Sequence, residues 1–317
     1  MILRTTTAVL LLSCALLGCG GADESTPTQE QDPGNAELLI ASVAPGAAAV
    51  VGRNEKITIT FHYPVVVDTL VVELAGQLVP LATLDDREFR FVPFPLHTAG
   101  ATYEVTIAAG LEDSTGQILD RDYTWSFETE AAAIESEPPP PLTEAEIALI
   151  TSGAVDVPMD LVTSYDDPQR ALYDISPPMD VESEHLPLFV DRMMTSVVAH
   201  GGIGLAAPQV GINRRLFVAR IGGTWQTFIN PSLDTWSPEL DQMEEACLSV
   251  PETPANVARP VWIDASSTRA DGSAVSGEHF ENTSAAVYPA RLWLHEFDHL
   301  NGILLIDRMG TPPAETL

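Results

Sequence analysis

The feature that most constrains this chain is the pentad His295-Glu296-Phe297-Asp298-His299, near the end of 317 residues. On an α-helix, residues four apart lie on one face, so His295 and His299 can bind one metal ion together. Glu296 lies between them and can move a proton on water at the metal. The pentad therefore predicts a helix that faces a pocket, with metal-dependent hydrolysis as its chemistry.

The first residues of the chain predict export. Arg4 precedes a short apolar run at 8–12, and Leu16-Leu17-Gly18-Cys19 follows it. This order is typical of a signal peptide, and the run is too short to cross a bilayer as a helix. The last four residues resemble a bacterial lipobox, which implies lipidation of Cys19. We expect a signal peptide over 1–18 and a protein that is lipid-anchored to the cell envelope; an ordinary signal cut nearby is the alternative.

The chain has three cysteines, and only Cys247 lies beyond the signal region, since the other two are Cys14 and Cys19. If Cys19 is acylated, the mature chain has no cysteine pair for an internal disulfide. An idle thiol is a liability in an exported protein, and a bound metal would protect Cys247 as a thiolate. A small buried side chain without a ligand fits Cys247 alone equally well.

Two domains are predicted between spacer segments. Residues 19–37 are rich in Gly, Ser, Thr, Gln and Pro, which indicates a flexible tether. Residues 131–141 end in four consecutive prolines, which form a stiff, extended linker. We therefore expect a first domain over 38–130 and a second over 142–317.

The first domain is predicted to be an all-β sandwich. Short runs rich in β-branched and aromatic residues alternate with turn sequences and predict strands at 57–61, 69–74, 88–93, 102–107 and 123–129. The region resembles a bacterial immunoglobulin (Ig)-like domain, which implies a spacer or a binding module with an unidentified partner. His62 and His97 are isolated, so we expect them at the surface or at a strand edge.

The second domain begins with a helix signal. Thr143 and Glu146 form a capping box, and an apolar stripe predicts a longer helix near 185–200. A glycine-rich turn follows at 201–211. Glycines there would let a ligand or a strand approach the backbone closely, although the turn alone is weak support for a site.

Three segments of this domain together resemble the signature motifs of peptide deformylases. They are Gly202-Ile203-Gly204-Leu205-Ala206-Ala207-Pro208-Gln209, Glu245-Ala246-Cys247-Leu248-Ser249 and His295-Glu296-Phe297-Asp298-His299-Leu300-Asn301-Gly302. The resemblance extends from about 156 to 309 and includes Arg259, Arg291 and Asp307. It implies an α+β deformylase-like fold, with mixed or antiparallel sheets around the His-Glu-x-x-His helix.

The resemblance also implies a metal centre. Cys247, His295 and His299 would bind one divalent ion and leave a fourth position for water. Glu296 would take a proton as water attacks and deliver it to the leaving amine. The resemblance implies Fe²⁺, whereas Zn²⁺ or another redox-quiet ion suits an aerobic exterior better.

Other residues would stabilise and position the substrate in a protein of this family. Gln209 and the backbone N–H of Leu248 would donate to the oxyanion, and Ile203 and Gly204 would present backbone to an extended peptide. Asp298 would orient a helix or a histidine, or else lie at the helix surface.

Two positions depart from the family pattern. Ala246 replaces a glycine before the cysteine, and Leu294 replaces a glutamine before the first histidine. If position 246 requires positive φ, alanine would cost about 1 kcal/mol and displace the thiolate.

The expected substrates are N-formylmethionyl peptides, or peptides that carry a similarly small acyl group, outside the cytoplasm. The net charge of −30 repels nucleic acids and anionic lipids, so we expect membrane contact only through the lipid anchor. Two alternatives remain open. One is a generic exported metalloprotease with Glu315 as third ligand, and the other is a non-catalytic surface lipoprotein with a relic fold.

Overall fold

The computed structural model describes residues 34–309 except positions 80, 95, 132–137 and 284–287. The predicted signal peptide, the lipidation site Cys19, most of the predicted tether and Glu315 lie outside the described residues. Among the helices of the described part, none is both long enough and apolar enough to span a membrane.

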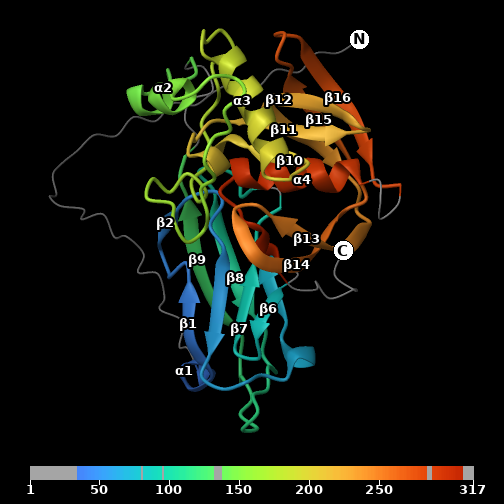
Figure 1. Ribbon diagram of the computed structural model, residues 1–317. Helices are drawn as coiled ribbons and strands as arrows, with labels where there is room; N and C mark the ends of the chain where they lie inside the picture. The colour runs from blue at the N-terminus through green and yellow to red at the C-terminus, as the bar shows by residue number, and fades with distance from the viewer. Residues whose placement is uncertain (1–33, 80, 95, 132–137, 284–287, 310–317) are drawn as a thin grey trace, which may run out of the picture. The chain divides into compact units, whose positions relative to one another are not determined.

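Residues 36–129 form mainly strands in two sheets (Figure 1). The elements are α1 (Ala36–Leu39), β1 (Ile40–Ala44), β2 (Val50–Val51), β3 (Ile57–Phe61), the 3₁₀ turn η1 (Val67–Thr69), β4 (Val72–Leu74), β5 (Gln77–Leu78), β6 (Ala82–Asp85), β7 (Glu88–Phe91), β8 (Thr102–Ile107) and β9 (Tyr123–Thr129). One sheet has the order β1-β3-β7-β6 and the other β2-β9-β8-β4-β5. All strand pairs are antiparallel except β2 with β9.

The two sheets share one apolar core, which confirms the predicted sandwich. Burial alternates along β3, so Ile57, Ile59 and Phe61 face inward while the threonines between them are only half-buried. From the other sheet, Val105 and Phe127 join the same core. Alternating burial on one face of each sheet is the pattern from which a sandwich is predicted.

Two expectations for this region were wrong. The predicted strand at 69–74 starts only at Val72, because the 3₁₀ turn η1 precedes it. His97 is buried rather than at the surface: its ring packs against Tyr103 and Phe127, and its Nε2 lies 3.1 Å from the carbonyl oxygen of Glu55. Burial lowers the pKa of His97, so this histidine is a neutral member of an aromatic cluster.

The second part of the chain is a mixed α and β structure. Its elements are α2 (Glu144–Thr151), α3 (Leu186–Ala199), β10 (Gly204–Ala206), the 3₁₀ turn η2 (Ala207–Val210), β11 (Leu216–Ile221), β12 (Thr224–Trp236), β13 (Leu240–Cys247), β14 (Val250–Pro260), β15 (Trp262–Thr268), β16 (Ala274–Glu281), α4 (Pro289–Leu300) and the 3₁₀ turn η3 (Leu305–Arg308). Five strands form an antiparallel sheet in the order β10-β11-β12-β15-β16, and β13 pairs with β14 separately.

The five-stranded sheet is covered on both faces. Along β11, Leu216 and Val218 enter the core that contains α3, whereas Phe217 and Ala219 enter the core that contains α4. In Figure 1, α4 lies between this sheet and the β13–β14 pair, and its residues contact both. The helix that carries the His-Glu-x-x-His pattern is therefore held from two sides.

A buried arginine fixes the start of this part of the chain. The predicted capping box is present, because the side chain of each of Thr143 and Glu146 accepts a hydrogen bond from the backbone N–H of the other at the start of α2. Arg214 donates to the Glu146 carboxylate at 2.8 and 2.7 Å and to the carbonyls of Pro140 and Pro141 at 2.7 Å each. One side chain thus joins the end of the proline run, α2 and the segment before β11.

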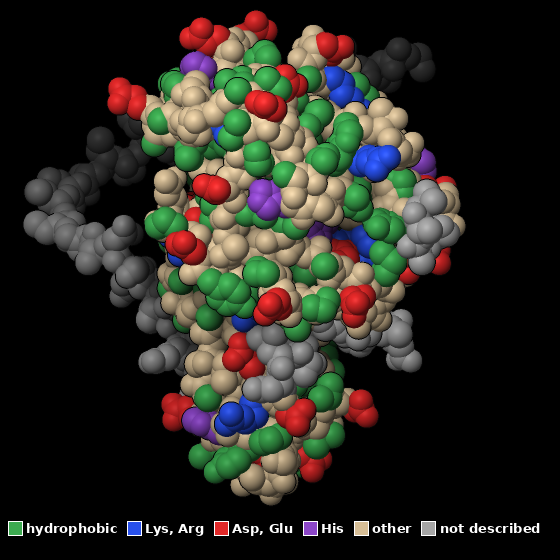
Figure 2. Space-filling model, in the orientation of Figure 1, with side chains coloured by type: hydrophobic (Ala, Val, Ile, Leu, Met, Phe, Trp, Pro, Cys, Tyr) green, Lys and Arg blue, Asp and Glu red, His purple; other side chains and the backbone are tan. Residues whose placement is uncertain are grey.

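Acidic side chains are spread over the face seen in Figure 2 rather than gathered into one patch.

Candidate active site

Two segments bring the three predicted metal ligands together. Cys247 is the last residue of β13, and His295 and His299 lie on α4. One potential ligand atom from each lies within 4.8 Å of the other two, and Cys247 Sγ is 3.3 Å from His299 Nε2. Among the described residues, this is the group of three or more such side chains that could hold a metal.

The donor set fits a divalent metal ion. Zinc binds sulfur at about 2.3 Å and nitrogen at about 2.0 Å, so two ligand atoms in a tetrahedral site lie roughly 3.5 Å apart. Burial raises the pKa of the Cys247 thiol, but the charges and hydrogen bonds of His299 and His295 lower it to about 5. The thiolate, which is the form that binds metals, is therefore stable here.

A carboxylate determines which nitrogen of His295 faces the site. Glu245 Oε2 lies 2.9 Å from His295 Nδ1, which leaves Nε2 available on the side of Cys247. Arg259 donates twice to Glu245, at 2.7 and 2.9 Å, and Arg291 donates once, at 2.6 Å. Burial raises the pKa of Glu245, but Arg259 and His295 outweigh burial and hold it well below its usual range. Glu245 is therefore a fixed anion that orients His295, one of the three predicted metal ligands.

Asp298 extends this buried network. Its carboxylate accepts from Arg259 at 2.7 Å and from Arg308 at 2.6 Å through two nitrogens, and its side chain is buried. The surface alternative for Asp298 is therefore wrong. Asp298 orients Arg259, which in turn holds Glu245, so it acts on the metal-binding residues from a distance.

Glu296 lies beside the predicted ligands in a tightly limited space. It is 3% exposed, burial raises its pKa to about 7, and its Oε2 has no hydrogen-bond partner among the described residues. A Cβ at Gly204 would lie 2.2 Å from Glu296 Oε1. Glycine is therefore required at 204 for space rather than for its backbone angles.

Gln209 is positioned by the turn that follows β10. Its Oε1 accepts from the N–H of Ala206 at 2.7 Å, so its Nε2 points to Ser249 Oγ at 3.3 Å and Cys247 Sγ at 3.7 Å. Leu248, whose N–H is the second predicted donor, lines the same cleft. The two predicted oxyanion donors thus belong to residues that line the cleft together with Cys247.

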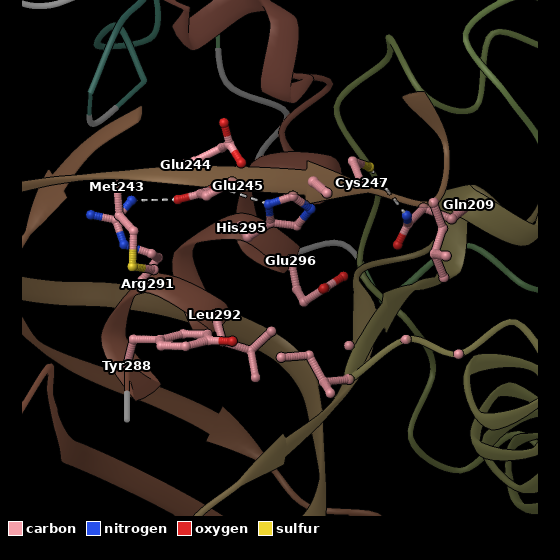
Figure 3. Close-up of a pocket in the computed structure, with 16 residues that line it drawn as sticks. Gln209, Met243, Glu244, Glu245, Cys247, Tyr288, Arg291, Leu292, His295 and Glu296 are labelled. Atoms are coloured by element: carbon pink, nitrogen blue, oxygen red, sulfur yellow. Dashed lines mark hydrogen bonds and ion pairs between the residues drawn. The ribbon is translucent and has the colours of Figure 1, made fainter. Parts of the chain in front are cut away.

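The predicted residues line one cleft of about 370 Å³, shown in Figure 3. Ile203 and Gly204 form one edge and β13 forms another. The lining also includes side chains to which the sequence analysis assigned no role, namely Met243, Glu244, Tyr288, Arg291 and Leu292. Leu292 and Tyr288 stand three and seven residues before His295, so helix periodicity could have identified them.

The two departures from the family pattern have separate consequences. Ala246 does not adopt positive φ, so the conditional strain of about 1 kcal/mol does not arise. It stands at an irregularity in the pairing of β13 with β14, is exposed and lines the cleft. Leu294 is fully buried in the core between α4 and the sheet, so it affects packing rather than the cleft.

Comparison with known proteins identifies two regions of the chain. The family model of polypeptide deformylases matches residues 159–314, and that of bacterial Ig-like domains matches residues 35–129.

Individual relatives agree with the first match. A peptide deformylase of Thermotoga neapolitana is 40% identical over 140 residues, which is 44% of this chain and 80% of that protein. A peptide deformylase of Clostridium botulinum is 44% identical over 126 residues, which is 39% of this chain and 80% of that protein. The crystal structure of a Thermotoga maritima peptide deformylase is 34% identical, with a TM-score of 0.45, and the likeness covers 49% of this chain and 99% of that one. The chain therefore belongs to the peptide deformylase family of hydrolases, with a bacterial Ig-like domain before its deformylase region.

Proposed function

We propose that this protein removes the formyl group from N-formylmethionyl peptides, as a metal-dependent amide hydrolase outside the cytoplasm. The observation that carries the proposal is the environment of Glu296. Its carboxylate is buried, has a raised pKa of about 7 and lies beside three potential metal ligands in an open cleft. A group with such a pKa can both accept and release a proton near neutral pH.

The side chains of the cleft divide the work of amide hydrolysis. Cys247, His295 and His299 would hold the metal, which when bound supplies a Lewis acid for water and the formyl carbonyl. Glu296 takes a proton from the attacking water and passes it to the nitrogen of the leaving peptide. This transfer balances the reaction, because water is split between formate and the free amine.

Two further groups favour the transition state. The Nε2 amide of Gln209 and the backbone N–H of Leu248 donate to the oxygen on which negative charge develops. Gln209 is held by its other end through Ala206, so its amide does not have to reorganise during the reaction. Ile203 and Gly204 present main chain along the cleft, where an extended peptide can pair as an added strand.

The first test measures deformylation of a formyl-Met-Ala-Ser peptide by the purified protein beside its Glu296→Gln variant. We expect turnover in the wild type, and a loss of at least about 100-fold in the variant because the proton carrier is removed. Metal content measured on both should remain at one ion per chain. If the wild type holds its metal but leaves formyl peptides intact, the proposal is wrong and a binding role gains support.

A Cys247→Ser variant separates the proposal from a generic metalloprotease. Here Cys247 is a ligand, so we expect the substitution to weaken metal binding severely. Unchanged metal affinity would instead indicate a third ligand elsewhere in the chain and favour the protease alternative.

We propose Zn²⁺ or another redox-quiet ion in place of Fe²⁺, because a thiolate-bound ferrous ion oxidises readily in an aerobic exterior. Elemental analysis of protein prepared from the cell envelope tests this. A predominance of iron would contradict it.

The proposed location rests on Leu16-Leu17-Gly18-Cys19 after a short apolar run. We expect the protein in the membrane fraction, and release of a Cys19→Ser variant into the soluble fraction. Both forms in the cytoplasm would contradict export.

A further inference from the structure

The cleft extends along one face of α4, away from the metal-binding residues. His295, Leu292 and Tyr288 follow one another at steps of three and four residues, and all three line the cleft. Seven steps along the chain separate Tyr288, at the start of α4, from His295, and at 1.5 Å per residue they span about 10 Å of helix axis. In Figure 3, Tyr288 lies at the end of the drawn cleft, with its hydroxyl directed toward Leu292 and the cleft interior.

This end of the cleft combines apolar side chains with the Tyr288 hydroxyl, the carboxylate of Glu244 and the guanidinium of Arg291. Ile203, Met243 and Leu292 contribute hydrocarbon and thioether surface. The Tyr288 hydroxyl makes no hydrogen bond to any residue that the structure describes. It is therefore a donor that is still available to a bound molecule.

Other side-chain hydrogen-bond donors near Tyr288 already have partners within the protein. Arg291 uses its terminal nitrogens on Glu245 and on the carbonyls of Val257 and Asp241, and its remaining Nε is buried. The amide of Gln209 lies beside Cys247 and Ser249, where the proposed function assigns it to the reacting oxygen. Glu244 can only accept hydrogen bonds when ionised, so Tyr288 supplies the side-chain donor at this end of the cleft.

The position of the scissile bond determines which part of a peptide meets Tyr288. A formyl group has a single carbon, so the first amino acid of the peptide follows directly after the bond that is cut. A linear side chain on that residue that follows this face of α4 away from His295 passes Leu292 and ends near Tyr288. Its terminal atoms are therefore the part of the substrate that the hydroxyl can contact.

We propose that Tyr288 determines specificity, by donating a hydrogen bond to an acceptor at the end of the substrate's first side chain. The proposal rests on the proposed deformylase function and names its substrate class. The thioether of methionine is a weak acceptor, whereas the oxygen of methionine sulfoxide is a strong one. The enzyme accordingly accepts peptides that begin with formyl-methionine sulfoxide as well as formyl-methionine, and both forms occur where methionine is exposed to oxidants.

The test compares wild type and Tyr288→Phe, which removes one oxygen and keeps the ring. Three peptides differ only in the first residue: formyl-methionine, formyl-methionine sulfoxide and formyl-norleucine, which replaces sulfur with a methylene group. We expect Tyr288→Phe to lower kcat/KM about 5-fold for the sulfoxide, about 2-fold for methionine and not measurably for norleucine. Tyr165→Phe, at a tyrosine that is 78% exposed, is the matched control and should change none of the three.

A binding measurement separates this inference from the proposed activity. The dissociation constants of the same peptides are measured by calorimetry on metal-loaded Glu296→Gln, with and without Tyr288→Phe. A sulfoxide preference that disappears with Tyr288→Phe supports the assignment, even if the wild type cleaves no formyl peptide and the proposed activity fails. Turnover of formyl-methionine together with equal effects of Tyr288→Phe on sulfoxide and norleucine would overturn the assignment and leave the activity intact.

Discussion

Position 204 has no room for a side chain, because it lies against the active site. The carboxylate of Glu296 fills the space that a Cβ at 204 would occupy, at 2.2 Å from Oε1. Gly204 belongs to strand β10 and Glu296 belongs to helix α4, so the backbone of each residue is held within a regular element. Adding one methyl group therefore displaces the Glu296 side chain first.

We predict that Gly204→Ala lowers kcat/KM for a formyl peptide about 100-fold, the usual cost of misplacing a catalytic group by about 1 Å. Bound metal should stay at the wild-type level, because the three atoms nearest to the new methyl group all belong to the Glu296 side chain. Gly46→Ala is the control, since a Cβ at Gly46 meets nothing within 4 Å. Loss of metal together with activity would show that the methyl group disturbs the whole site.

Other residues of the site could be predicted only in part. The roles of His295, Glu296 and His299 follow from helix spacing, which is local. The role of Glu245 depends on Arg259 and Asp298, which are 14 residues and 53 residues further along the chain. Such a network forms only when β13, β14 and α4 pack together, so spacing along the sequence does not reveal it.

At the scale of elements, helix α2 depends on one buried ion pair. Burial raises the pKa of Glu146, but hydrogen bonds from Arg214 and Thr143 lower it below its ordinary value of 4.5. The folded carboxylate therefore holds its proton less tightly than the unfolded one. Its contribution to the free energy of unfolding is complete above the unfolded pKa and is lost as pH falls through the folded pKa.

We predict that Glu146→Gln lowers the free energy of unfolding by about 3 kcal/mol near neutral pH, because it leaves the buried Arg214 charge with carbonyl partners but no anion. The difference from wild type should shrink in acid, where the wild-type carboxylate becomes protonated as well. Urea unfolding at neutral and acidic pH measures both. Glu144→Gln, at an exposed position of the same helix, should have little effect, and a pH-independent difference for Glu146→Gln would contradict the argument.

Some strands could be predicted from their sequences, and others could not. Strands β3, β8 and β9 coincide with predicted runs, because one face of each is buried and their residues alternate. Strand β11 was not predicted. Both of its faces are buried, so Leu216-Phe217-Val218-Ala219 is a continuous apolar run that periodicity does not distinguish from a buried helix.

For the whole molecule, the described residues form separate apolar cores. One lies within residues 36–127, and the metal-ligand residues belong to the part of the chain that contains the other three. A metal that binds only the native site stabilises the structure that holds its ligands.

We predict that a chelator lowers the melting temperature of the deformylase region and leaves the unfolding of the Ig-like region unchanged. Free metal at a concentration 100 times its dissociation constant adds about 2.7 kcal/mol to the free energy of unfolding. Differential scanning calorimetry with and without chelator should therefore show one transition that moves and one that does not. A single transition that shifts as a unit would contradict independent cores.

The contacts of Arg214 have a mechanical consequence. If the proposed N-terminal anchor holds the chain at a membrane, a pull along the backbone reaches the deformylase region through residues 138–141. The carbonyls of Pro140 and Pro141 are tied to Arg214, which is itself buried and paired with Glu146. We therefore expect a pull along the proline run to load this arginine and α2 directly, at a point of the chain remote in sequence from α4 and its histidines.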